Sequence, residues 1–305
     1  MTIAKTPPDT RLDIARVRYH GWPDCCVATN GIVEAVVVPA VGRVMQFRFA
    51  GDDRGVFWEN RSLDGHAAKH GSKWMNFGGD KAWPAPQENW GSVAGRAWPP
   101  PQAFDSLPYD IRDEAGELIM ISPVDPNYGI QVIRRISLAP KLPVMTISTR
   151  YSKLAGAPVG VGVWIVTQLR DPQAVFALLP DPADGFRQVA GPRPLGLKNE
   201  GRLLSLRRDP EHNLKIAMRG AALAWMDEKC ILRIQASSPD ACQPCSTAVY
   251  TNKDPLAYVE LETETSLERM TVGDHLELTN TYTLTRRSVA NASAEACNAF
   301  GLLPL

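Results

Sequence analysis

The sequence lacks an excess of either charge, and it lacks long apolar runs. Its 305 residues carry 33 lysines and arginines against 33 aspartates and glutamates. A chain without a basic surplus has no global field to attract phosphate backbones, which argues against nucleic acid as a partner. No stretch reaches the ~18–20 apolar residues of a membrane span, so we expect no membrane association. Residues 1–11 do not resemble a secretory signal, and we expect a cytoplasmic protein.

Motifs for metals and nucleotides are also missing. Cys242 and Cys245 have C-x-x-C spacing, but no second pair completes a zinc site. His66 and His70 lie four residues apart without the glutamate of an HExxH motif, which leaves them only a weak alternative as an acid or metal ligand. Neither a Walker loop nor a G-x-G-x-x-G turn between strand and helix is present. We therefore predict no metal and no cofactor.

Amphipathic helices are nearly absent, and short β-rich segments take their place. Residues 159–169 show the strongest alternation, with valine and isoleucine on one face and Trp164 and Gln168 on the other. Together with 23 glycines and 25 prolines, this pattern predicts stacked antiparallel sheets in one domain spanning residues 1–305. We expect a long loop at 181–199 and one short helix near 294–303. Further strands are predicted at 32–38, 43–49, 118–122, 130–138, 144–151, 174–179, 221–226, 230–236, 247–250, 257–263 and 275–284.

Residues 57–104 interrupt the strand pattern and hold five of the eight tryptophans. A loop of this length needs a function or a packing role. A flat indole can cover the apolar face of a sugar ring, while amide and charged groups bond its hydroxyls. Asn76, Asp80, Lys81 and Trp83 supply both kinds of group within eight residues, and the adjacent Gly78–Gly79 pair permits close backbone approach to a ligand. The alternative is that the tryptophans plug one end of a sandwich.

The order of segments resembles the galactose mutarotase-like (aldose 1-epimerase) superfamily. The resemblance rests on Val-Pro-x-x-Gly-Arg-Val-Met-Gln-Phe at 38–47, the strand at 159–169, the glutamate strand at 259–263 and the final strand through Leu284. The run Gly-Gly-Asp-Lys-x-Trp-Pro-Ala-Pro-Gln at 78–87 is similar to a bacterial branch of that superfamily. This likeness implies an all-β supersandwich of two large, curved antiparallel sheets, with a sugar cleft on the concave face.

The resemblance also implies roles for particular residues. Mutarotases pair a carboxylate base with a histidine acid, which is general acid–base catalysis. Glu262 occupies the base position. The stretch that matches the family's Asn-His-x-Tyr motif reads Trp-Ile-Val-Thr-Gln and holds no histidine, so Asp80 or Lys81 is expected to act as the acid. Trp164 and Gln168 in that stretch suit stacking and hydrogen bonding better than proton transfer.

The predicted sugar-binding residues come from four separate segments. They are Trp83, Trp164, Gln168, Asn76, Glu260 and Arg43. Glu260 and Glu262 would share a face at period two, although they could instead form the solvent face of their strand. Two alternatives to an enzyme stay open at this point, namely a non-catalytic carbohydrate-binding protein and an interaction domain whose tryptophan loop docks a partner. The sequence leaves the sugar and the oligomeric state open.

Overall fold

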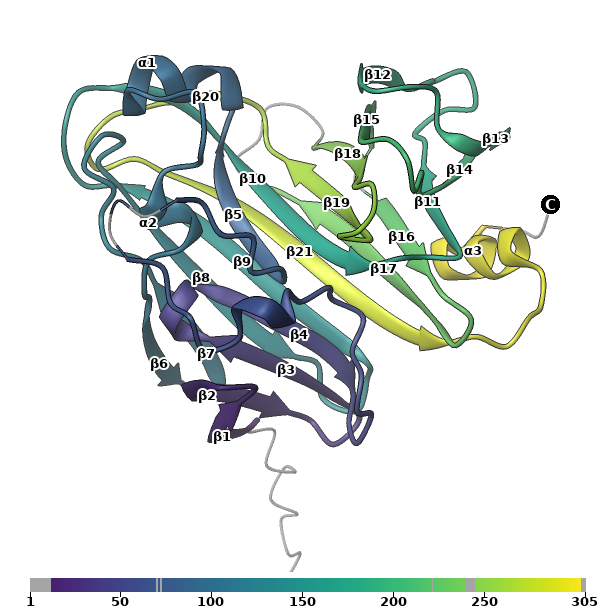
Figure 1. Ribbon diagram of the computed structural model, residues 1–305, viewed down its shortest axis with the longest axis horizontal. Coiled ribbons are helices and arrows are strands. Elements are labelled where there is room, and N and C mark those ends of the chain that lie inside the picture. The colour runs from purple at the N-terminus through teal and green to yellow at the C-terminus, as the bar shows by residue number, and fades with distance from the viewer. Residues whose placement is uncertain (1–11, 70, 72, 221, 240–244, 303–305) are drawn as a thin grey trace, which may run out of the picture.

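Two large antiparallel sheets make up the part of the chain that the computed structural model describes, which is residues 12–69, 71, 73–220, 222–239 and 245–302 (Figure 1). Among these residues the first sheet has eleven strands in the order β1-β2-β3-β4-β5-β10-β19-β18-β15-β12, with β20 paired to β10. The second has ten, in the order β13-β14-β11-β16-β17-β21-β9-β8-β7-β6. The all-β prediction is confirmed.

The strand and helix bounds are as follows. The first sheet contains β1 (Asp13–Tyr19), β2 (Trp22–Thr29), β3 (Val33–Val38), β4 (Arg43–Phe49), β5 (Asp80–Ala85), β10 (Val159–Arg170), β19 (Tyr258–Glu264), β18 (Ser246–Thr251), β15 (Leu214–Arg219), β12 (Arg187–Ala190) and β20 (Glu268–Met270). The second contains β13 (Leu195–Glu200), β14 (Leu203–Arg207), β11 (Ala174–Leu178), β16 (Ala222–Met226), β17 (Cys230–Ser237), β21 (His275–Arg286), β9 (Val144–Lys153), β8 (Ile130–Leu138), β7 (Glu117–Ile121) and β6 (Asp110–Glu114). The helices are α1 (Trp90–Ala94), α2 (Gln102–Asp105) and α3 (Ala292–Phe300).

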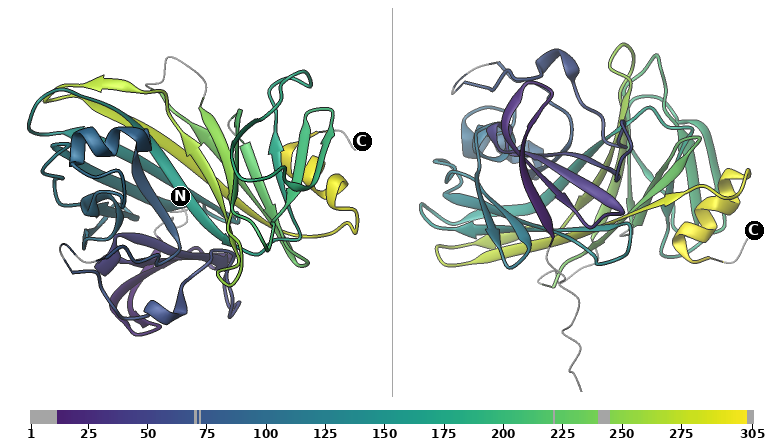
Figure 2. Two further views of the ribbon diagram at one scale, coloured as in Figure 1. Left: turned by 45° about the horizontal axis from the view of Figure 1, so that its top comes forward. Right: turned by 90° about the horizontal axis from the view of Figure 1, so that it is seen from below.

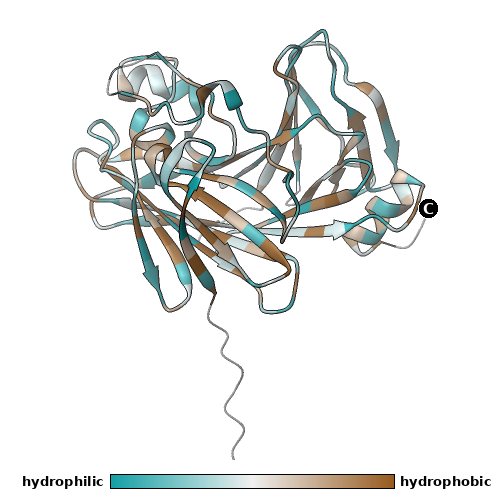
Figure 3. Ribbon diagram, turned by 60° about the horizontal axis from the view of Figure 1, so that its bottom comes forward, coloured by the Kyte–Doolittle hydropathy of each residue, from teal (hydrophilic) through white to brown (hydrophobic). Residues whose placement is uncertain are grey.

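Strand β10 is buried on both faces and organises the first sheet. Its β-branched run, which favours extended backbone, pairs antiparallel with β5 on one side and β19 on the other. Val163 and Ile165 point into the apolar core between the two sheets, and Trp164 and Gln168 point to the other face. Hydropathy follows this arrangement, because hydrophobic residues concentrate in the strands and hydrophilic ones in the connections (Figure 3).

Two segments predicted as loops contain strands. The stretch 57–104 includes β5, the short helices α1 and α2, and the 3₁₀ turns at Arg61–Leu63 and Gln87–Asn89. The stretch 181–199 contains β12 and most of β13, whose residues are largely exposed. Both predictions were wrong for the same reason. Proline and glycine occur here at strand ends and at edges, where they do not prevent sheet pairing.

Helix α3 packs on the second sheet, at the opposite end of the molecule from β1 to β4 (Figure 2). The Asn291 side chain accepts a hydrogen bond from the Ala294 amide at its start, and Gly301 ends it in the left-handed conformation. The short C-terminal helix is thus confirmed. None of the helices in the described residues has the length and apolarity to cross a membrane.

Candidate functional site

Strand pairing gathers most of the predicted site residues on one face of the first sheet. Trp164 lies opposite Trp83, and Val166 lies opposite both Lys81 and Glu262. Gln168 lies opposite Glu260 one pleat further along. Since paired residues in a sheet project to the same side, these side chains share one surface. We call it the polar face; its members are Lys81, Trp83, Trp164, Gln168, Glu260, Glu262, Glu264, Lys215 and Tyr258.

Glu262, the predicted base, is held by two donors. Trp164 Nε1 donates to Glu262 Oε2 over 2.9 Å, and Lys215 Nζ lies 2.6 Å from the same oxygen. Burial disfavours the Lys215 ammonium, but the Glu262 carboxylate more than offsets this, so the pKa of Lys215 lies above its usual value. Lys215 was missed from sequence because β15 is distant from β19 along the chain. A half-buried lysine between the apolar residues Leu214 and Ile216 was the available signal.

Glu260 has a different environment from Glu262. Its Oε1 accepts a hydrogen bond of 2.7 Å from Gln168 Nε2, and the residue is 8% exposed. Burial raises the pKa of Glu260, and the Lys81 charge opposes that shift. Tyr258 lies two residues earlier on the same face, with Asn76 and Gln168 beside its hydroxyl. The period-two spacing from Glu260 could have identified Tyr258 from sequence.

Lys81 is 1% exposed, and its ammonium has no hydrogen-bond partner among the described residues. The nitrogen lies 4.9 Å from the centroid of the Trp83 ring, within cation–π distance. Burial lowers the pKa of Lys81 to about 8, against the opposing pull of the Glu260 carboxylate. Burial likewise raises the pKa of Glu264 to about 7. Several polar-face groups, among them Lys81, Lys215, Glu260 and Glu264, therefore have pKa values displaced from their usual ones.

Asp80, the other predicted acid, does not lie on the polar face. As the neighbour of Lys81 in a strand, it projects to the opposite side, into the core between the sheets. There it forms an ion pair with Arg134 and accepts hydrogen bonds of 2.6 Å from both Thr167 Oγ1 and Tyr282 Oη. It is fully buried. The structure thus separates Asp80 from the other candidate residues and surrounds it with donors.

Arg43 projects to the same side of the first sheet as Lys81, because its neighbour Val44 pairs with Asp80, and it is 1% exposed. Its Nη2 is 2.8 Å from Asp105 Oδ1, and Trp83 Nε1 donates to that same oxygen over 2.9 Å. The Arg43 charge contributes to the lowered pKa of Lys81. Asp105, on α2, was not predicted. It fixes both Arg43 and the indole of Trp83.

The loop tryptophans pack mainly against one another. Trp83 makes edge-on contacts with Trp90, Trp98 and Trp164 at centroid distances of 5.8, 6.1 and 5.3 Å. Trp83 and Trp164 are only 4% and 6% exposed, whereas Trp98 is 46% exposed. Edge-on packing leaves little of the Trp83 ring free to stack on a sugar. The loop is therefore largely an aromatic plug, with Trp98 at its rim, and does not form a broad protruding patch.

Gly78 and Gly79 allow close approach of backbone to backbone. Both have positive φ, of 91° and 69°. A Cβ on Gly78 would collide with the carbonyl of Trp58, and one on Gly79 with that of Val44. The two glycines therefore permit tight backbone packing at the start of β5, whereas close approach to a ligand was expected from the sequence.

Unpaired buried polar atoms concentrate around the polar face. Within the described residues, nine buried side-chain nitrogen or oxygen atoms lack a hydrogen-bond partner. Six of them belong to Arg43, Trp74, Asn76, Lys81 and Gln168. Because leaving such atoms unpaired costs about 1–3 kcal/mol each, their concentration indicates a surface that forms hydrogen bonds beyond those within the chain.

Metal binding has no support in the described residues, where no group of three or more His, Cys, Asp or Glu side chains is placed to hold an ion. His70 and Cys242, which belong to the two spacings noted in the sequence, lie outside the described residues. Cys245 is a buried free thiol.

Comparison with known proteins identifies the class of fold. No family model matches the sequence, and no curated protein matches it. Solved structures do match. A putative aldose 1-epimerase from Escherichia coli K12 aligns with a TM-score of 0.59 and 12% identity over 86% of this chain and 98% of its own. A galactose mutarotase-like protein from Lactobacillus casei gives 0.58 and 8% over 86% and 100%. A putative aldose 1-epimerase from Klebsiella pneumoniae gives 0.59 and 12% over 90% and 83%.

These matches, together with the two stacked sheets, show that the chain has the galactose mutarotase-like fold. At such low identity the likeness shows the fold, and the chemistry must be argued from the site.

Proposed function

We propose that this protein binds an aldose on the polar face and interconverts its anomers, with Glu260 and Lys81 as the proton-transfer pair. The observation that carries the proposal is the opposite displacement of their pKa values on β5 and β19, the two strands that flank β10 on the polar face. Burial lowers the pKa of the Lys81 ammonium to about 8 and raises the pKa of the Glu260 carboxyl group. Groups whose pKa values approach working pH are suited to general acid–base catalysis.

The proposed reaction moves two protons and breaks one bond. The Glu260 carboxylate takes the proton of the anomeric hydroxyl, while the Lys81 ammonium gives a proton to the ring oxygen. The bond between the anomeric carbon and the ring oxygen breaks, giving the open-chain aldehyde. After rotation about the C1–C2 bond, the ring oxygen attacks either face of the carbonyl and both protons return.

The remaining groups of the polar face have binding and positioning roles in this proposal. Gln168 holds the Glu260 carboxylate through Nε2, and its unpaired Oε1 can accept from a sugar hydroxyl. The Glu262 carboxylate already accepts from Trp164 and Lys215, which makes it a less available base than Glu260. Asn76 offers a further unpaired acceptor.

Polarimetry of freshly dissolved α-glucose and α-galactose tests the proposal. The expected result is faster approach to the anomeric equilibrium than in buffer alone. Lys81→Met and Glu260→Gln should each reduce the catalysed rate by about 10²–10⁴-fold. Lys253→Met and Glu117→Gln, which alter exposed groups away from the polar face, serve as matched controls. Equal rates in the wild type and both site variants would contradict the assignment.

Carbohydrate binding without catalysis is the second candidate. It is favoured by the unpaired donors and acceptors around the polar face, which a sugar's hydroxyls could satisfy without any proton transfer. Calorimetric binding of a sugar combined with no acceleration of mutarotation would select it over the enzyme.

A further inference from the structure

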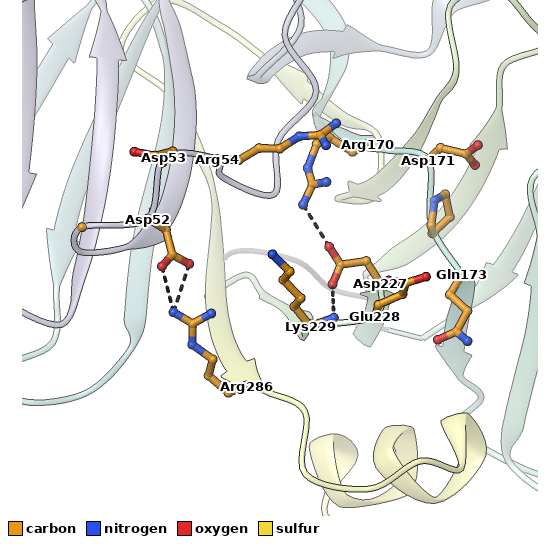
Figure 4. Close-up of a pocket in the computed structure, with 12 residues that line it drawn as sticks. Asp52, Asp53, Arg54, Arg170, Asp171, Gln173, Asp227, Glu228, Lys229 and Arg286 are labelled. Atoms are coloured by element: carbon orange, nitrogen blue, oxygen red, sulfur yellow. Dashed lines mark hydrogen bonds and ion pairs between the residues drawn. The ribbon is translucent and has the colours of Figure 1, made fainter.

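Two adjoining cavities lie at the end of β10, next to the polar face. The larger, of about 720 Å³, is bounded by the turn after β4, the β10–β11 connection, the β16–β17 hairpin and the end of β21 (Figure 4). The smaller, of about 240 Å³, reaches Trp58 and shares with the first the residues Asp53, Arg54 and Arg170. Since they share these walls, we treat them as one charged groove.

Trp58 stands between this charged groove and the polar face. Its backbone amide donates to the Gln168 carbonyl over 2.9 Å, which fixes the segment beside β10. Its ring lies over Tyr258, with centroids 4.6 Å apart and planes tilted by 35°. Tyr258 in turn is two residues from Glu260 on the same face. A chain of contacts therefore leads from the proposed reaction centre to the groove, past a half-buried indole.

Ion pairs hold some of the charged side chains of the groove wall, whereas two cationic side chains have no such partner among the described residues. Arg170 is 3.0 Å from Asp227, and Arg286 is 2.9 Å from Asp52. The side chains of Arg54 and Lys229 make no hydrogen bond or ion pair within the described part of the chain. Figure 4 shows the Lys229 amine directed into the space between the two ion pairs.

The lining of the larger cavity selects for a hydroxyl-rich, neutral ligand. It includes four cationic side chains and five carboxylates, together with Gln173. Near balance of charge gives no net attraction for a phosphate or a polycation. A lining that holds both donors and acceptors instead matches sugar hydroxyls, each of which can donate one hydrogen bond and accept others. Trp58, which lines the smaller cavity, adds an aromatic surface for the apolar side of a sugar ring.

We infer that the ligand is an oligosaccharide rather than a free monosaccharide. Its reducing-end residue lies on the polar face, the next residue packs on Trp58, and the following one enters the charged groove. This inference rests on the proposed function, because it uses that site for the reducing end. It adds a ligand class and names Trp58, Arg54 and Lys229 as residues that determine chain-length specificity.

Isothermal titration with matched series of sugars tests the inference. Glucose, galactose, mannose and xylose are compared with their di-, tri- and tetrasaccharides. In one series, we expect the trisaccharide to bind at least tenfold more tightly than the monosaccharide. The ratio of the monosaccharide dissociation constant to that of the trisaccharide should fall at least threefold in Arg54→Ala, Lys229→Ala and Trp58→Ala. It should be retained in Arg112→Ala, which removes a cation that is 62% exposed on β6, outside the groove.

The outcomes separate this inference from the proposed function. Monosaccharide binding or mutarotation with no gain from chain length overturns the oligosaccharide inference and leaves the proposed function standing. A gain that survives all three groove substitutions also overturns it. Binding of neither monosaccharides nor oligosaccharides overturns both. Arg54 and Lys229 are exposed, so their variants should keep the wild-type unfolding temperature, and Trp58→Ala is interpreted only beside them.

Discussion

Asp80 and Lys81 are adjacent in sequence and both are buried, yet their surroundings on the two sides of β5 are opposite in character. On the inner side, Asp80 has Arg134, Thr167 and Tyr282 as partners. On the outer side, Lys81 has an aromatic ring nearby and no hydrogen bond within the described residues. A buried charge with a full set of partners indicates a structural role. A buried charge without them costs stability, which is expected where a group is kept for chemistry.

The inner network should show the largest effect on stability. Asp80→Ala removes the carboxylate and leaves the Arg134 guanidinium buried without its counter-ion. We expect a loss of about 3–5 kcal/mol in the free energy of unfolding. Urea unfolding followed by circular dichroism measures it. Glu114→Ala, at a surface pair with Arg112 separated by 3.9 Å, should change the free energy by less than about 1 kcal/mol. Comparable losses in the two variants would remove the distinction between the faces.

Lys81→Met should have the converse effect on the outer face. The substitution removes an unpartnered ammonium and keeps an unbranched apolar side chain, so stability at pH 7 should be unchanged or higher. The catalysed rate should fall by about 10²–10⁴-fold, because the proposed acid is lost. A loss of stability as large as that of Asp80→Ala would instead assign Lys81 a structural role.

The pH dependence of stability gives an independent test of Lys81. Its folded-state pKa, about 8, lies below the unfolded value of 10.5, so the unfolded chain binds more protons between these limits. The contribution of this group to stability therefore increases as pH rises from 8 to 10.5. Lys81→Met should remove that increase, which denaturant unfolding at several alkaline pH values would detect. An unchanged profile would show that the lysine titrates normally.

The sequence predicted the strands better than their partners. Alternation along 159–169 correctly placed Trp164 and Gln168 on one face, because strand period depends only on local geometry. Pairing joins strands far apart in the chain, so the contact of Lys215 with Glu262 could not be read from either segment. The side to which Asp80 points was equally hidden, since β5 is six residues long and follows two glycines.

The tryptophan loop shows a second limit. Its composition is consistent both with a sugar-stacking surface and with an aromatic plug, because both require large flat side chains near polar groups. Only the three-dimensional packing distinguishes them. Trp83 is enclosed by other indoles, whereas Trp58, which sequence gave no reason to prefer, lies at the boundary of the charged groove.

Glu260 and Glu262 lie on the same polar face, but Glu260 is the proposed base and Glu262 is held by Trp164 and Lys215. Glu260→Gln should lower kcat by at least about 10²-fold, because it removes the proposed base. Glu262→Gln leaves Lys215 without its carboxylate partner, at a cost of about 1–3 kcal/mol in stability, and should have the smaller effect on kcat. Steady-state kinetics with both variants, alongside their unfolding midpoints, measure the two effects. A greater loss of kcat in Glu262→Gln would return the role of base to Glu262.

Glu264 should show the smallest effect, and only as a change with pH. Burial raises its pKa to about 7 from 4.5, so the folded protein binds more protons than the unfolded chain between these values. Its contribution to stability is therefore full below pH 4.5 and is lost as pH rises toward 7. Glu264→Gln should flatten this decline by about 1–2 kcal/mol, allowing for partial exposure of the side chain. Urea unfolding at pH 5 and pH 7.5 measures the difference between variant and wild type. The same decline in both proteins would show that Glu264 ionises as an ordinary surface carboxylate.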